Sequence, residues 1–159
     1  MQIEVDIIND LKLIFNNSIL VIAFITWISN QTIKSVLFYF TDKRWDISRF
    51  FGAGGMPSTH SALSISVAVS IGYREGWHTS LFALAMILAI IVMADAAGVR
   101  RATGEQAKVL NRIIIEFFDE IKIKDRRLRE FIGHTPFEVI VGAIIGFVIA
   151  SIISIYFKI

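Results

Sequence analysis

Two histidines stand beside hydroxyl and acidic residues at the borders of apolar stretches, where they could act on an anion. The stretch GGMPSTHSAL places His60 directly after Ser58 and Thr59, and the stretch GHTPFEV places His134 four residues before Glu138. On a helix the second spacing puts both side chains on one face. The carboxylate can then bind one imidazole nitrogen and leave the other to react. These residue types favour acid–base or nucleophilic chemistry.

The turn before His60 is also a candidate anion site. Pro57 is suited to the first turn of a helix, and the first N–H groups of a helix have no intrahelical acceptor. Gly54 and Gly55 precede it and would let the backbone approach a bound anion closely. We therefore expect this turn to bind a group such as a phosphate. A capped, glycine-hinged start of a helix is the purely structural alternative.

Further charges lie inside or beside apolar stretches. Lys34 follows Asn30 by one helical turn within an apolar segment, where an ammonium costs about 2.5 to 3.5 kcal/mol. The lysine either extends its ammonium to the lipid headgroups or belongs to an anion site inside a helix bundle. Asp95 stands near the end of another apolar segment, shortly before Arg100 and Arg101. A structural role for Asp95 would be to pair with Lys34, Arg100 or Arg101.

Membrane helices must position these groups. The chain of 159 residues is 55% hydrophobic and has a mean hydropathy of +0.64, more than an ordinary soluble domain shows. Crossing a bilayer core of about 30 Å takes roughly 17 to 25 mostly apolar residues in a helix. Four stretches meet or nearly meet this length, about 18–40, 57–73, 81–99 and 136–157. We expect an all-α, polytopic membrane helix bundle that forms one domain over 1–159.

Two helices outside the spans are also expected. Residues 2–16 have an apolar face and an acidic face, which suits a helix lying at the membrane interface. In the long loop, residues 105–121 place Val109, Ile113 and Phe117 at helical spacing. They predict an amphipathic helix on the membrane or on the bundle.

The distribution of lysines and arginines predicts the orientation. With four spans, the loops 41–56 and 100–135 share one side of the membrane and contain most of the cations. Cytoplasmic loops collect Lys and Arg, so we expect both loops in the cytoplasm and both termini outside the plasma membrane. The polar groups around Lys34, His60 and His134 would then meet at the cytoplasmic face.

Such a set of groups suits phosphoryl transfer, which depends mostly on positioning and charge stabilisation. A Zn²⁺ or Mn²⁺ site built from His60, Asp95, His134 and Glu138 is the metal-dependent alternative. However, the last two are the only close-spaced ligand pair, and nearby cations would oppose a metal. We expect neither a metal nor another cofactor.

Three strings, GGMPSTHSA, DAAGVRRATGEQAKVLN and GHTPFEV, resemble in order and spacing the divergent branch of the phosphatidic acid phosphatase type 2 family. This family is distantly related to the vanadium haloperoxidases. The resemblance covers roughly residues 18–157. It implies a bundle of membrane helices whose substrate is a lipid phosphate or diphosphate, isoprenoid or glycerolipid.

Carried over residue by residue, the resemblance implies that His134 is the nucleophile, Glu138 its orienting acid and His60 the proton donor to the leaving group. Lys34 would bind the phosphate. Thr59 and Glu138 stand where the better-studied branch has Gly and Asp, and no Arg-Pro follows Lys34 at the expected distance. Further phosphate binding is therefore assigned to Ser58, Thr59, Arg44, Arg100 and Arg101, with supporting roles for Asp95, Gly54, Gly55 and Pro57.

Two other functions remain open. The same anion site could bind a lipid phosphate, or move it across the bilayer, without hydrolysing it. Alternatively, the chain could be a packing subunit in which GAIIG, residues 142–146, is a helix dimerisation face. The lipid bilayer and a membrane lipid phosphate are the expected partners, a homo-oligomer is possible, and no nucleic-acid partner is expected.

Overall fold

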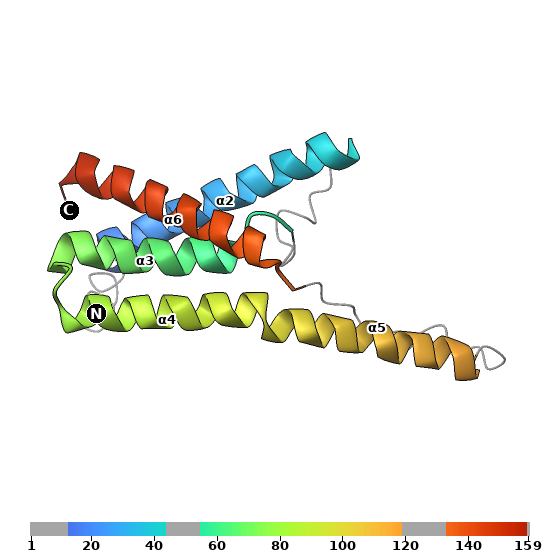
Figure 1. Cartoon of the computed structure of the whole chain (residues 1–159). Coiled ribbons are helices and arrows are strands. Elements are labelled where there is room, and N and C mark those ends of the chain that lie inside the picture. Colours follow the sequence, from blue (N-terminus) through green and yellow to red (C-terminus); the bar gives the residue numbers. More distant parts are fainter. Residues whose placement is uncertain (1–12, 44–54, 119–132, 159) are drawn as a thin grey trace, which may run out of the picture.

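The computed structural model describes residues 13–43, 55–118 and 133–158, and every regular element in these ranges is an α-helix (Figure 1). The helices are α2 (Ser18–Asp42), α3 (Thr59–Glu75), α4 (Ser80–Ala97), α5 (Val99–Phe118) and α6 (Pro136–Phe157). The all-α membrane bundle expected from hydropathy is therefore confirmed, with helix bounds close to the predicted spans. The expected interfacial helix over 2–16 lies outside the described residues except for its last part.

Helix α3 is the centre of the bundle, because it packs against α2, α4 and α6 (Figure 1). Its Ile65 and Val69 join a buried apolar cluster to which all three neighbours contribute. Its 17 residues include four serines. The hydroxyls of Ser66 and Ser70 donate to carbonyls one turn earlier in the same helix. A helix that faces protein on several sides can carry such residues, whereas a lipid-facing one favours continuous apolar surface.

Three helical stretches are long and apolar enough to cross a membrane: α2, the α4–α5 stretch Ser80–Ile114, and α6. Their outer faces expose large apolar side chains, among them Leu84 and Leu88 on α4 and Ile140 and Phe147 on α6. In water such a surface would be costly. It is the surface expected of an integral membrane protein.

The contact between α3 and α6 depends on two glycines. A Cβ atom at Gly142 would collide with the backbone carbonyl of Ser58, and one at Gly146 would collide with that of Ala62. Small residues at this spacing let helices approach closely. These glycines therefore pack against α3 within the same chain, and the alternative in which they form a dimerisation face is wrong.

Helix α5 nearly continues the line of α4, with Gly98 between the two (Figure 1). The predicted amphipathic helix is confirmed as far as Phe118, but it begins earlier, so that Arg100 and Arg101 lie in the helix rather than in a loop. Among the described helices α5 contacts only α4. Of the two expected placements, on the membrane or on the bundle, the described residues show no packing of α5 on α2, α3 or α6.

Candidate functional site

The site lies at the end of the bundle where α3 and α6 begin and α4 ends. The backbone N–H of Ser58 donates to the carbonyl of Glu138 at 3.1 Å, and the N–H of His134 donates to the carbonyl of Ala96 at 3.1 Å. These two bonds join the start of α6 to the start of α3 and to the end of α4. Three helix ends are thereby fixed around one another.

The start of α6 holds His134 through a capping box. Thr135 is the N-cap, its hydroxyl accepts from the N–H of Glu138 at 3.3 Å, and its own N–H donates to Glu138 Oε2 at 2.9 Å. The same carboxylate oxygen lies 3.2 Å from Nδ1 of His134. An ionised carboxylate only accepts, so this contact is a hydrogen bond when Nδ1 carries the proton. A negative charge in the first turn also complements the helix dipole.

His134 itself is buried, with 2% of its surface exposed. Its ring faces that of His60, which is the second residue of α3. The ring centroids are 6.1 Å apart and the planes are inclined by 62°. The two histidines selected from separate motifs therefore lie side by side at one end of the bundle.

The start of α3 differs from the expectation. Ser58 is the N-cap, with extended backbone angles, and its hydroxyl accepts from the N–H of Ser61 at 3.4 Å. Pro57 therefore precedes the cap and does not start the helix, because a serine oxygen satisfies the first-turn donors in that position. Ser58 is fully buried. Its hydroxyl also lies 3.0 Å from that of Ser61, so it forms its hydrogen bonds within the protein.

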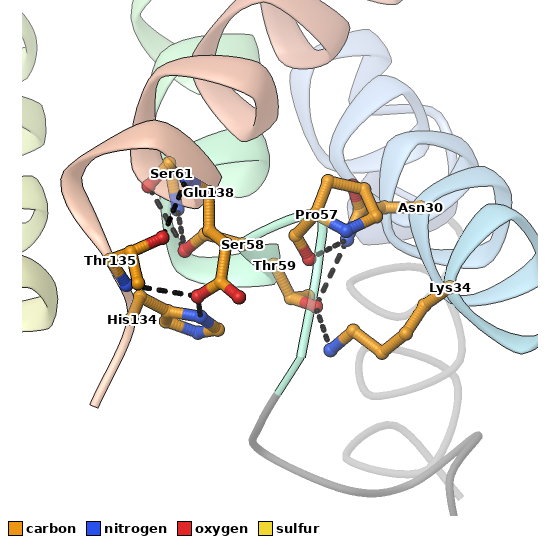
Figure 2. Close-up of polar contacts among 9 residues, drawn as sticks. All are labelled: Asn30, Lys34, Pro57, Ser58, Thr59, Ser61, His134, Thr135 and Glu138. Carbon is orange, nitrogen blue, oxygen red and sulfur yellow. Dashed lines mark hydrogen bonds and ion pairs between the residues drawn. The ribbon is translucent and has the colours of Figure 1, made fainter. Parts of the chain in front are cut away.

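Thr59 connects α3 to α2 (Figure 2). Its hydroxyl accepts from Lys34 Nζ at 3.1 Å and from Asn30 Nδ2 at 3.0 Å, and it donates to Gln31 Oε1 at 3.3 Å. Asn30 Nδ2 also donates to the carbonyl of Pro57 at 3.3 Å. A hydroxyl offers one donor and two acceptor positions. All three are filled here, so Thr59 fixes the lysine relative to the histidine that follows it.

Lys34 is 4% exposed. The ammonium is thus held inside the bundle, and the alternative in which it extends to the headgroups is wrong. Figure 2 shows Lys34 and the pair of His134 and Glu138 on opposite sides of the turn that contains Thr59.

The other predicted site residues are placed as follows. Gly55 has a φ of +90°, in the left-handed region that favours glycine. Asp95 is half-buried in the last turn of α4, Arg101 is exposed on α5, and Arg100 lies in the first turn of α5. Arg44 and Gly54 lie outside the described residues. Within the described ranges, no group of three His, Cys, Asp or Glu side chains could hold a metal ion.

Sequence reasoning missed one group at this site, Thr135, and one contact, the bond between Thr59 and Lys34. Thr135 belongs to the pattern T-P-F-E, a threonine followed three residues later by a glutamate, which is a recognisable capping-box signal. No sequence pattern predicts that Thr59 binds Lys34, because the two residues lie on different helices that are far apart in the chain.

Comparison with known proteins gives two matches. The model of a family described as the Divergent PAP2 family matches residues 15–149. An uncharacterized membrane protein of Bacillus subtilis (strain 168), YuiD, is 35% identical over 138 residues, which are 80% of this chain and 87% of that protein. No solved structure gives a significant match.

Proposed function

The chain belongs to the divergent PAP2 family, and on this premise we propose that it is a membrane lipid phosphatase. Its substrate would be an isoprenoid or glycerolipid phosphate or diphosphate, hydrolysed through a phosphohistidine intermediate. The observation that carries the proposal is the pairing of His60 with His134 at the polar end of an apolar helix bundle. The proposed reaction uses no metal ion.

In the first step, Nε2 of His134 attacks the phosphorus of the lipid phosphate. The bond from phosphorus to the lipid oxygen breaks, and protonated His60 donates its proton to that oxygen. In the second step, His60 accepts a proton from a water molecule that attacks the phosphohistidine. The P–N bond then breaks, and inorganic phosphate leaves with both histidines restored.

Glu138 and Lys34 support this sequence through charge. Glu138 holds Nδ1–H of His134, which presents Nε2 to phosphorus and stabilises the positive charge that develops on the ring. Lys34 would stabilise the non-bridging oxygens of the phosphate. Because the hydroxyls of Ser58 and Thr59 are used within the protein, we assign them to holding the turn and the lysine. This departs from the direct phosphate binding expected of them.

The remaining phosphate contacts stay predictions. Arg44, Arg100 and Arg101 are the candidates for further cations on the phosphate, Gly54 and Gly55 for close backbone approach, and Asp95 for orienting one of the cations. The positive charge distribution favours placing the site in the cytoplasmic leaflet of the plasma membrane.

A phosphate-release screen of the purified protein tests the proposal. The substrates are isoprenoid and glycerolipid phosphates and diphosphates, in detergent and in the presence of a chelator. We expect release by the wild-type protein, none by the His134→Ala variant and a loss of about 10²- to 10⁴-fold in the His60→Ala variant. The matched control is His78→Ala, which changes an exposed histidine in the turn between α3 and α4. Release by His134→Ala at the wild-type rate would overturn the proposal.

One observation favours a second function, the transport of a lipid phosphate without hydrolysis. Ser66 and Ser70 lie one turn apart on one face of the central helix and are buried, so hydroxyl groups extend along α3 beyond the site. A flipping assay with reconstituted vesicles separates the two functions. Translocation without any phosphate release would favour transport and remove the phosphatase.

A further inference from the structure

A groove of about 300 Å³ lies between α3 and α4 and begins at the candidate site. His60 lines one end of it. The rest of its wall is almost entirely apolar and includes Leu63 and Val67 from α3 and Ala85, Ala89 and Val92 from α4. Ser64 is the other polar side chain in the lining. The groove thus joins a polar end at His60 to an apolar length between α3 and α4.

The groove lies on one side of α3 because the two neighbouring helices pack differently. On the α6 side, Gly142 and Gly146 bring the backbones into direct contact. On the α4 side, the small side chains of Ala85 and Ala89 line an open space instead. The space beside His60 is therefore directed along α3 and α4.

The length of the groove follows from the helices. Because α3 runs away from the site and α4 runs toward it, Val67 and Ala85 mark the far end. Seven residues separate Val67 from His60, which on a helix is about 10 Å. Leu88, another lining residue, is 59% exposed. The groove therefore opens toward the lipid-facing surface of the protein.

We propose that this groove binds one hydrocarbon chain of the lipid phosphate, with the phosphate group at His60 and His134. The inference rests on the proposed function for the position of the phosphate. A hydrocarbon chain gains little free energy by exchanging lipid for an apolar protein wall. The groove therefore contributes orientation rather than affinity, because its shape fixes the direction in which the phosphate meets the histidines. Any second chain of the lipid stays in the bilayer.

Photocrosslinking tests this inference without relying on turnover. The probe is a single-chain alkyl phosphate with a diazirine near the end of its chain, added to the full-length protein in nanodiscs. Labelled peptides are mapped by mass spectrometry. An alkyl alcohol with the same diazirine is the control for general contact with lipid, and unlabelled dodecyl phosphate is the competitor.

We expect the phosphate probe to label residues 63–67 and 85–92 and to be displaced by the competitor, whereas the alcohol labels the outer faces of all the spans. The Ala85→Phe variant, which fills the far end of the groove, should reduce this labelling at least fivefold. Ala83→Phe, the same change at an exposed position of α4, should leave it unchanged.

Labelling by the phosphate probe that matches the pattern of the alcohol would overturn the inference, and this result needs no variant. Unchanged labelling in the Ala85→Phe protein would overturn it as well. If labelling of the groove depends on the phosphate but no substrate is hydrolysed, the groove assignment stands and the phosphatase proposal fails.

Discussion

The rings of His60 and His134 face each other edge to face, with centroids 6.1 Å apart, although His60 lies in the first turn of α3 and His134 directly precedes the N-cap of α6. A nucleophile must come within about 3 to 3.5 Å of the reacting atom. A general acid must lie within about 2.6 to 3.2 Å of the oxygen that it protonates. The proposed mechanism requires one phosphate group to meet both requirements, the first at Nε2 of His134 and the second at His60.

The hydroxyl of Thr59 is expected to hold Lys34 in place. The Thr59→Val variant keeps the shape of the side chain but leaves the polar atoms of Asn30, Gln31 and Lys34 without this partner. We expect a loss of stability of about 1 to 3 kcal/mol, together with a raised KM for the lipid phosphate. Thermal unfolding and initial rates in detergent measure the two effects. Thr59→Ser, which retains the hydroxyl, should have the stability and the KM of the wild-type protein. An unchanged KM in Thr59→Val would contradict the claim that Thr59 positions Lys34.

Glu138 is expected to act through its charge rather than through the fold of α6. Glutamine at this position is compatible with a capping box, so the Glu138→Gln variant should keep its thermal stability within a small margin. Its amide cannot stabilise a charged imidazole as a carboxylate does, and kcat should fall by about 10²- to 10⁴-fold. Rates near the wild-type value in a correctly folded Glu138→Gln protein would show that His134 does not need this acid.

Gly146 is expected to stabilise the monomer through its contact with α3. In the Gly146→Ala variant the added methyl group meets the backbone of Ala62, and overpacking of this kind costs about 1 to 3 kcal/mol. The melting temperature in detergent should fall, while Val148→Ile, which adds a carbon at an exposed position of α6, should not change it. An unchanged melting temperature in the Gly146→Ala protein would contradict this contact.

Much of this arrangement follows from hydropathy. The four apolar stretches predict the bounds of α2, α3, α4 and α6 to within a few residues, because the length of the bilayer core restricts them. Their alternating directions bring Lys34, His60 and His134 to one end. Hydropathy does not predict which side chains make contact between helices. The glycine spacing of α6 is equally compatible with a helix of the same chain and with a helix of a second copy. Whether α3 starts at Pro57 or after Ser58 depends on local capping geometry.

The side of the membrane that the site faces can be tested with single cysteines, because the chain has none of its own. Lys108→Cys places one on the exposed surface of α5, and His78→Cys places one in the turn at the opposite end of the bundle. With a membrane-impermeant maleimide we expect the His78→Cys protein to react in intact cells. The Lys108→Cys protein should react only in inside-out vesicles. The reverse pattern would place the site on the outer face.

The central claim is that His134 forms a covalent bond to phosphorus. The most direct measurement is a rapid quench of the purified protein with a ³²P-labelled lipid phosphate, under alkaline conditions that preserve phosphohistidine, followed by peptide mapping. We predict label on the peptide that contains His134 and none in the His134→Ala protein. Rapid turnover with no label on that histidine at any quench time would contradict the account.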